Sequence, residues 1–526
     1  MKFGKLALCL FLALVLLLTA VACGGAKKPD EPGNEGGNAG NATSGNNDET
    51  ATKAPNNTAD LPDDLDLNNE EFIFHSIVQR YAAGEFEADM DGSVVNTAIY
   101  KRNDAIQEKY NCKITAEETV GNTNTAEMLE YGTQLMSDNT QERRILVTAG
   151  YRMASLAIRG YLADLAAVDA IDLDKDYYSQ GYNEALSVGN SQYLVTGKMT
   201  LSYYRYMLPL FFSRDMLSKA NIEYPYQLVL DKAWTYEEME KIVRQLYVDK
   251  TGDGLTDDDT YGYYLFTGGN SSETDAFMAA CDLSVISKDE SNYYVIDIDV
   301  NKFDSAISNV LNLLRSEGTY VTSETTNEKT MAKFVAGESG FMSMRMYCVE
   351  EKSMRDMGNS GKGYGILPVP MADAEQGRYV SYVQDQCFMF GIPSTVANET
   401  LQQMGQFFEA YAAESYNTVR PAYYERALTT RYVKDTDSRQ MIEIIDSSTY
   451  MDPLNVYIGS AFSFNTTSIR SVYNWREEDV TITGLLYKYV VGTATEPSQL
   501  QRDVDKLNQK YQEILINGPV VETPEG

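Results

Sequence analysis

The residue types best suited to chemistry in this chain are tyrosines and arginines that follow short apolar runs. Tyr151 and Arg152 follow the run 145–149, while Arg345 and Tyr347 follow the run 341–344. A tyrosine ring can stack on a flat apolar face, and a guanidinium group can donate paired hydrogen bonds. Because open α/β sheets bind ligands at the carboxyl ends of their strands, these positions predict a site for a polar, ring-shaped ligand.

The same reasoning extends to other aromatic and polar residues. Trp475 has no capping role in its local sequence, so we expect it to stack on a ligand. The remaining candidates are Arg80 and Tyr81 after the first predicted strand, Tyr203 and Tyr206, and Asn270 in a Gly-rich loop. For each candidate the alternative is an ordinary turn or core position.

The composition argues against nucleic-acid binding and against most catalytic chemistries. The chain has 76 acidic and 44 basic residues, a formal charge of −32, which repels phosphate backbones. Its single histidine, His75, lies within an apolar run, which favours a buried, hydrogen-bonded side chain over a catalytic base. A glycan hydrolase remains an alternative, because a pair of carboxylates at the required separation cannot be recognised among so many acids.

Residues 249–260 have the spacing of an EF-hand-type calcium loop. Its oxygen donors would come from Asp249, Thr251, Asp253, Leu255 and Asp257, with Gly254 at the sharp turn. Thr260 stands where a bidentate acid is expected. The segment therefore predicts either a structural calcium ion or a solvated Asp-Gly turn, and no other cofactor is expected.

The N-terminal 67 residues have the features of a signal followed by a tether. Two lysines precede the apolar run 6–18, and small residues precede Cys23, as in a bacterial lipobox whose cysteine is lipidated. The alternative is a soluble secreted product. Residues 24–67 contain no aromatic side chain and are too polar to bury a core, which predicts a disordered tether. No later apolar run is long enough to span a membrane, so the lipid would be the only anchor.

Apolar patterns in the rest of the chain alternate between strand and helix. The run 72–78 predicts a strand, 303–314 and 401–411 predict helices, and Thr235 with Glu238 forms a capping box that gives Trp234 a structural role. This alternation predicts an α/β fold with parallel strands. The cysteines at 112, 281, 348 and 387 are widely spaced, so zinc is not expected and their disulfide state is open.

Several short segments of the chain, taken in order behind the lipoprotein-like signal, resemble the extracellular solute-binding proteins of bacterial ABC importers. The resemblance is to the large carbohydrate-binding class in particular. The segments that carry the resemblance are 94–103, 108–111, 160–165, 225–226, 234–236, 261–263 and 364–370. The resemblance implies a two-lobed, periplasmic-binding-protein-like fold of type II, with a hinge and an interlobe cleft that closes on ligand. It also implies that the chain crosses between lobes near 202–209 and returns near 384–392.

The expected organisation follows from this resemblance. It comprises a signal peptide (1–23), a tether (24–67), a first α/β lobe (68–204), a second α/β lobe (205–385), a return to the first lobe (386–448) and C-terminal helical segments on the second lobe and hinge (449–526). The resemblance implies a monomeric, lipid-anchored protein on the extracellular face of the cell membrane. It would capture a carbohydrate, such as an oligosaccharide, and deliver it to ABC permease subunits without being an enzyme. A glycan-binding or sensory lipoprotein without a transporter is the other reading.

Overall fold

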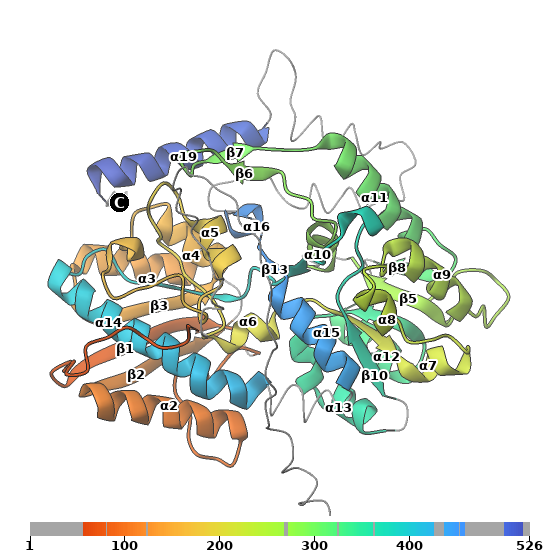
Figure 1. The fold of residues 1–526 in the computed structure, drawn as a ribbon, viewed down its shortest axis with the longest axis horizontal. Helices are drawn as coiled ribbons and strands as arrows, with labels where there is room; N and C mark the ends of the chain where they lie inside the picture. Colours follow the sequence, from red (N-terminus) through yellow and green to blue (C-terminus); the bar gives the residue numbers. More distant parts are fainter. Residues whose placement is uncertain are drawn as a thin grey trace, which may run out of the picture. The chain divides into compact units, whose positions relative to one another are not determined.

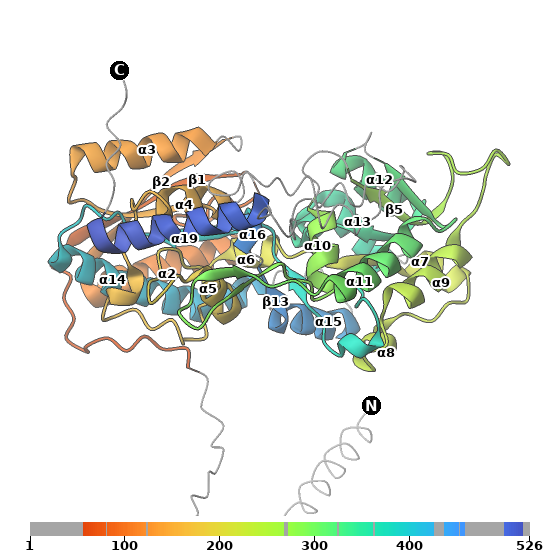
Figure 2. The ribbon, with the colours of Figure 1, turned by 90° about the horizontal axis from the view of Figure 1, so that it is seen from above.

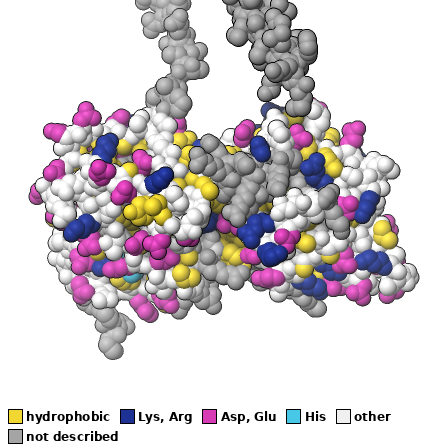
Figure 3. Space-filling model, turned by 90° about the horizontal axis from the view of Figure 1, so that it is seen from below, with side chains coloured by type: hydrophobic (Ala, Val, Ile, Leu, Met, Phe, Trp, Pro, Cys, Tyr) yellow, Lys and Arg dark blue, Asp and Glu magenta, His cyan; other side chains and the backbone are white. Residues whose placement is uncertain are grey.

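The computed structural model describes residues 56–79, 81–121, 125–267, 272–322, 326–360, 363–424, 436–451, 453–457 and 499–518. Four residues with predicted roles, Cys23, Arg80, Asn270 and Trp475, lie outside these ranges. None of the helices within the described ranges is both long and apolar enough to cross a membrane. Acidic side chains are spread over the face shown in Figure 3, with lysines and arginines between them.

The first sheet has the strand order β12-β3-β1-β2, and Figure 1 labels β3, β1 and β2 of it. Its strands are β1 (Glu70–Val78), β2 (Cys112–Val120), β3 (Arg143–Ala149) and β12 (Phe388–Gly391). β1 runs parallel to β2 and β3, whereas β12 runs antiparallel to β3. The two edge strands of this sheet, β2 and β12, therefore come from parts of the chain that are far apart in sequence.

Helices cover the first sheet and supply the other half of its core. They are α2 (Val94–Tyr110), α3 (Thr125–Asp138), α4 (Gly150–Ala157), α5 (Gln180–Leu186) and α14 (Asn398–Glu414), which continues into a π-helical turn at Ser415–Val419. Phe72 on β1 is fully buried and stacks on Phe407 of α14 with ring centroids 4.1 Å apart. This contact attaches a late helix to the first strand of the sheet.

The second sheet has the order β10-β4-β9-β5-β8. Its strands are β4 (Leu210–Ser213), β5 (Tyr261–Phe266), β8 (Thr319–Thr322), β9 (Ser339–Ser343) and β10 (Tyr364–Leu367). β5 is parallel to β8 and β9, and β4 is antiparallel to β9 and β10. The helices of this half are α7 (Arg214–Lys219), α8 (Tyr226–Leu230), α9 (Tyr236–Leu246), α10 (Glu273–Ala280), α11 (Val300–Leu314), α12 (Asn327–Ala336) and α13 (Lys352–Asn359).

Helix α9 begins where the capping pattern predicted. The Thr235 hydroxyl accepts a hydrogen bond from the Glu238 N–H at 3.4 Å, and the fully buried Trp234 donates from Nε1 to the Pro368 carbonyl at 3.1 Å. Gly262 lets α9 approach the sheet, because a Cβ atom there would lie 2.2 Å from the Val243 carbonyl oxygen. Trp234 is thus a structural residue of the second half.

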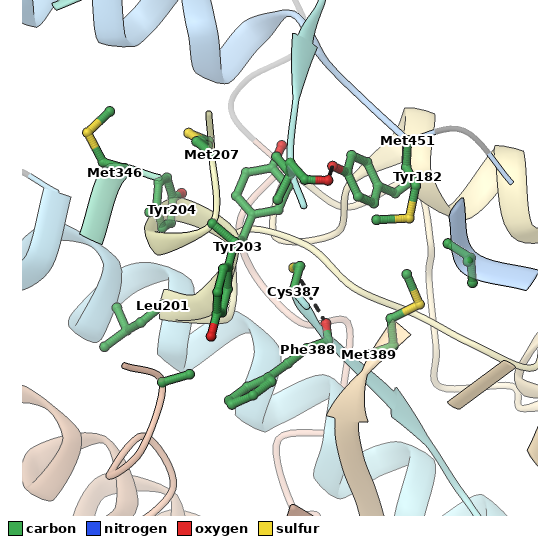
Figure 4. Packing of buried hydrophobic residues seen from close by; sticks show 14 of the residues in the cluster. Tyr182, Leu201, Tyr203, Tyr204, Met207, Met346, Cys387, Phe388, Met389 and Met451 are labelled. Atoms are coloured by element: carbon green, nitrogen blue, oxygen red, sulfur yellow. Dashed lines mark hydrogen bonds between the residues drawn. The ribbon is translucent and has the colours of Figure 1, made fainter. Parts of the chain in front are cut away.

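The segments that join the two sheets lie side by side. One follows α6 (Leu201–Arg205), the second contains β11 (Ser381–Tyr382), and the third is β13 (Thr449–Tyr450) after α15 (Thr436–Ser447). The Leu208 N–H donates to the Tyr382 carbonyl at 3.0 Å, and β11 pairs with β13 in parallel. Figure 4 shows the buried residues of this region, among them Tyr182, Tyr203, Met207 and Cys387.

The described C-terminal helices contact parts of both halves. They are α16 (Pro453–Tyr457) and α19 (Gln499–Asn517), and α19 lies along the β6–β7 hairpin (Ile286–Lys288 and Tyr294–Ile296; Figures 1 and 2). Tyr511 of α19 stacks on Tyr193 at 5.6 Å, and Asn508 exchanges hydrogen bonds with the backbone of Tyr294. Helix α19 therefore contacts both the segment 68–204 and the segment 205–385. The resemblance implied contacts only with the segment 205–385 and the hinge.

Residues 56–67, which the composition assigned to the tether, lie on the folded body. The Lys175 ammonium, almost fully buried, donates to Asp60 at 2.7 Å and to Asn56 at 2.9 Å. Asn57 and Asn417 exchange two hydrogen bonds, and Leu67 is 2 % exposed. Composition missed these contacts because each depends on one polar partner far along the chain.

Candidate functional site

Most of the described candidate residues stand directly after strands of the two sheets. Tyr81 follows β1, Tyr151 and Arg152 follow β3, and Arg345 and Tyr347 follow β9. Tyr151 and Arg152 lie in the first turn of α4, which begins at Gly150 directly after β3. The Gly150 N–H donates to the Asp385 carbonyl at 2.8 Å, which joins this turn to the second crossing segment.

Three tyrosines from distant segments meet in this region. The Tyr81 and Tyr347 rings stack with their centroids 4.0 Å apart and an angle of 11° between their planes. Tyr206 meets Tyr347 edge to face at 6.1 Å. Burial raises the pKa of Tyr347 to about 12 and raises that of Tyr206 as well, so both hydroxyls stay protonated.

Arg345 is a buried guanidinium beside these rings. Its Nε donates to the Gln384 side-chain carbonyl, its Nη2 donates to the Ser272 hydroxyl at 3.2 Å, and its Nη1 lies 3.8 Å from a Glu273 carboxylate oxygen. Burial disfavours the charge, but the nearby Glu273 carboxylate outweighs it and raises the pKa of Arg345. The group therefore stays a cation, fixed in direction by three partners.

Arg152 is the second buried guanidinium of the region. It is 2 % exposed, and its central carbon lies 5.4 Å from the centre of the Tyr151 ring. Its Nε has no hydrogen-bond partner among the described residues. Burial raises the pKa of Tyr151, and the charge of Asp385 contributes to the raised pKa values of both Tyr151 and Arg345.

We call the residues Tyr81, Tyr151, Arg152, Tyr206, Arg345 and Tyr347 the tyrosine–arginine cluster. It holds six of the seven described candidates for ligand binding, and it gains Gln384, Asp385, Ser272 and Glu273, which the sequence did not indicate. Gln384 and Asp385 precede β12 in a short polar interruption of an apolar run, which was the available signal. The contacts of Ser272 and Glu273 with Arg345 connect distant segments and leave no local pattern.

Tyr203 is the described candidate that does not join this cluster. Its side chain is fully buried, its hydroxyl shares a hydrogen bond with Thr449, and its ring packs edge-on against Tyr182 at 5.9 Å. Figure 4 shows it among the buried residues of this region, and it lines a pocket together with Thr449. It lies within α6, whereas Tyr206 follows the end of that helix.

His75 and the cysteines have structural surroundings. His75 Nδ1 lies 3.1 Å from a Glu117 oxygen, and its ring stacks on Tyr131 at 3.6 Å. Burial lowers the pKa of His75. The cysteines at 112, 281, 348 and 387 are free and buried, and burial raises the pKa of Cys112 and Cys387 to about 12.

The loop 249–260 does not gather the donors of a calcium site. Its backbone bends at Gly252 and Gly254, which have positive φ, and Asp249 accepts backbone hydrogen bonds within the turn. However, the Asp257 carboxylate binds Lys329 at 2.7 Å and Tyr264 at 2.7 Å. No group of three or more acidic, histidine or cysteine side chains suited to a metal occurs in the described residues. The calcium prediction is therefore not supported, because the Asp257 carboxylate is paired with a lysine.

Comparison with known proteins identifies the fold. Neither a protein-family model nor a curated protein sequence matches the chain. The solved structure of the sugar-binding protein MalE from Xanthomonas citri is 14% identical, covers 85% of this chain and 97% of its own, and has a TM-score of 0.52. A sugar transporter protein from Rhizobium etli, solved in an open conformation, is 15% identical over 84% of this chain and 99% of its own, with a TM-score of 0.50. The chain therefore has the two-lobed α/β fold of the periplasmic-binding-protein type that these sugar-binding proteins share.

Proposed function

We propose that this chain is a lipid-anchored, extracellular solute-binding protein that captures a carbohydrate at the tyrosine–arginine cluster and delivers it to an ABC permease. The fold supports the first part, since solved structures that share it include sugar-binding proteins. The signal-like residues 1–23 and the lipobox-like run ending at Cys23 support the anchor.

The observation that carries the proposal is the contact between Tyr81 and Tyr347. Tyr81 follows β1 of the first sheet, Tyr347 follows β9 of the second, and their rings are parallel at 4.0 Å. The two faces are thus held in the orientation in which aromatic rings cover the apolar face of a sugar ring. A sugar that separates the two rings would contact both lobes at once, which couples binding to lobe movement.

Arg345 supplies the polar half of such a site. Its three partners hold the guanidinium beside Tyr347 and Tyr206. A charged donor that is already desolvated and oriented gives a strong hydrogen bond to a sugar hydroxyl, because little ordering is required on binding. The cluster can therefore recognise hydroxyls and ring faces together.

Calorimetry with a panel of glycans tests this site. We expect Tyr347→Ala to weaken binding of the best glycan about tenfold or more, since it removes a central aromatic anchor. Tyr347→Phe keeps the ring and should lose much less. Tyr320→Ala is the matched control, because Tyr320 is also a half-buried tyrosine that packs against other tyrosines but lies on β8, away from the cluster.

Three results would contradict parts of the proposal. If no glycan binds, the carbohydrate assignment is wrong although the fold stands. If product sugars accumulate during incubation, the chain is a hydrolase. If Tyr347→Ala and Tyr320→Ala have equal effects, the ligand binds elsewhere.

The anchor is tested separately with Cys23→Ser. We expect this variant to appear in the medium or as an unprocessed precursor, and to lose metabolic lipid labelling. Labelling that persists in Cys23→Ser would contradict lipidation at this cysteine. Copurification of the wild-type chain with a permease decides between transport and a glycan-holding or sensory role.

A further inference from the structure

The β6–β7 hairpin belongs to the second half by sequence but contacts the first half in space. We call residues 282–299 the β6–β7 arm. The chain enters this arm from α10 and leaves it into α11, and both helices belong to the second half. In Figures 1 and 2 the arm extends from α11 to the first half, where it lies beside α19. The arm therefore connects the two halves in addition to the three segments that contain α6, β11 and β13.

Lys288 attaches the first strand of the arm to the end of α5. Its ammonium group donates to the Glu184 carbonyl at 2.5 Å, to the Ser187 hydroxyl at 2.9 Å and to the Ser187 carbonyl. The same ammonium group lies 5.2 Å from the centre of the Tyr294 ring. One side chain of the arm thus makes several hydrogen bonds to the first half.

The turn and the second strand of the arm are attached to the same part of the first half. The Asn292 side-chain amide donates to the Ser187 hydroxyl at 3.0 Å and to the Gly189 carbonyl at 2.6 Å. The Asn292 carbonyl accepts from the Gly189 N–H at 3.1 Å. The Tyr294 hydroxyl donates to the Ala185 carbonyl at 2.9 Å. Both strands of the hairpin and its turn therefore bond to the first half.

Helix α19 ties the hairpin to the first half a second time. The Asn508 side chain bonds to the N–H and to the carbonyl of Tyr294. Tyr511, one turn further along the helix, stacks on Tyr193 and shares a hydrogen bond with Tyr457 at 2.6 Å. The hairpin, α19 and the first half are thus joined by direct contacts.

The other end of the arm is fixed to the second half. The Asp282 carboxylate binds the Arg378 guanidinium at 2.5 Å, and the Lys302 ammonium of α11 donates to the Asp282 carbonyl at 2.7 Å. An element that is fixed at both ends must bend, or release one end, when the parts it joins move apart. Either change costs free energy, because hydrogen bonds between partly buried groups are lost or distorted.

We propose that the β6–β7 arm is a strap that limits how far the two halves can separate. Separation of Tyr81 from Tyr347 at the tyrosine–arginine cluster would strain the arm or release its Lys288 and Asn292 contacts. The strap therefore shifts the population towards the form in which the halves lie close together. The proposal rests on the two-lobed fold and does not depend on the carbohydrate assignment.

Distances between two spin labels in the full chain, measured without any sugar, test the proposal. The labels are placed at Asn190→Cys in the first half and at Asp304→Cys on α11, because both positions are exposed. Cys9 and Cys23 are replaced by serine, and the four described cysteines are buried. The labels therefore report the separation of the halves on the side where the arm crosses between them.

The variant Lys288→Met/Asn292→Gly releases the arm. Methionine keeps an apolar stem without the ammonium group, and glycine tolerates the positive φ of 63° at position 292. We expect the label-to-label distances to become longer and more broadly distributed than with the native arm. Exchange of the Gly189 amide hydrogen should become about tenfold faster or more, because the bond to Asn292 is no longer held in place.

Lys250→Met/Asn221→Gly is the matched control. Lys250 pairs with Glu338 at 3.2 Å within the second half, and Asn221 is also an asparagine with positive φ, at 55°. This variant loses the same chemical groups away from the arm. It should leave both the distances and the Gly189 exchange unchanged.

Several outcomes would overturn the proposal. They are equal distance distributions with native and released arms, an equal shift in the control variant, and Gly189 exchange that is equally fast in the wild type and the released variant. If the released variant does not fold, Tyr294→Phe decides, since it removes only the hydroxyl that bonds to the Ala185 carbonyl. Tyr294→Phe should lengthen the distances, and unchanged distances would overturn the proposal. The carbohydrate function is judged separately by the glycan panel.

Discussion

Glu409 is a buried carboxyl group in the core of the first half. It is fully buried on α14 and accepts hydrogen bonds from the Tyr178 hydroxyl at 2.7 Å and from the Tyr177 hydroxyl. Burial raises the pKa of Glu409 from 4.5 to about 7, because desolvation of the charged form outweighs the two hydrogen bonds. This side chain therefore changes its charge near neutral pH.

We predict that Glu409 makes the protein less stable as the pH rises from 5 to 8. Between pH 4.5 and 7 the folded state keeps a proton that the unfolded state has released, so the free energy of unfolding falls with pH. The fall is on the order of 3 kcal/mol when complete. Glu409→Gln cannot titrate. Scanning calorimetry should therefore show that the melting temperature of Glu409→Gln, minus that of the wild type, increases between pH 5 and pH 8.

Glu414→Gln is the control for this titration, because Glu414 is a less buried acid at the end of the same helix. Its melting temperature at the two pH values gives the effect of replacing a carboxyl group on this helix. A Glu409→Gln difference that does not change with pH would show that Glu409 is ionised throughout.

Single residues of the site differ in how far the sequence could reveal them. Tyr81, Arg345 and Tyr347 follow apolar runs, and the rule that ligands bind after strands selects them without any tertiary information. Tyr203 and Tyr206 were predicted from the same segment, yet Tyr203 packs into the core while Tyr206 meets Tyr347. A pattern of residue types cannot separate these two, because the end of α6 decides which way each ring points.

Elements with a local cause were predictable, and those that depend on distant partners were not. The capping residues Thr235 and Glu238 set the start of α9, and the apolar run 145–149 lies in β3. The start of α4 at Gly150 was not predicted, because the Asp385 carbonyl and the close approach of Met389 shape it. The loop 249–260 has the sequence of a cation site, but its Asp257 carboxylate forms an ion pair with Lys329 of α12. The loop sequence alone does not reveal this distant partner.

We predict that the loop 249–260 is stabilised by Lys329 and not by calcium. A chelator should leave the melting temperature of the wild type unchanged. Asp257→Asn should lower the free energy of unfolding by up to about 1 kcal/mol through loss of the 2.7 Å ion pair, and added salt should shrink this effect. The Lys329 and Tyr264 partners also lower the pKa of Asp257 against the effect of its burial, so the pair persists at neutral pH.

Asp253→Asn is the matched control for this loop, because Asp253 is exposed and its described side-chain bond is to the neighbouring Thr251. It should unfold like the wild type. A drop in melting temperature on chelation that Asp253→Asn abolishes would restore the calcium site.

At the scale of the whole molecule, residues 56–67 belong to the folded body through the contacts of Asn56, Asp60 and Leu67. We predict that a chain beginning at Pro55 melts like one beginning at Gly24, whereas a chain beginning at Leu61 melts lower. The second truncation removes Asn56 and Asp60 and leaves the buried Lys175 ammonium without two of its partners, which should cost about 1 kcal/mol or more. Thermal melts of the three chains measure this difference.

Asp60→Asn within the longest chain checks that the Lys175 contact causes the loss. It should reproduce part of the lower melting temperature. Equal melting of all three truncations would show that residues 56–60 add no stability, as the composition alone suggested.

The order of strands along the chain also sets the order of events during synthesis. β1, β2 and β3 lie before residue 150, but β12, which pairs with β3, lies at Phe388–Gly391, and all five strands of the second sheet are made in between. Until β12 leaves the ribosome, β3 has an unpaired edge and its sheet cannot close. The first sheet is therefore completed only after about three quarters of the chain has been made, although three of its four strands are made first.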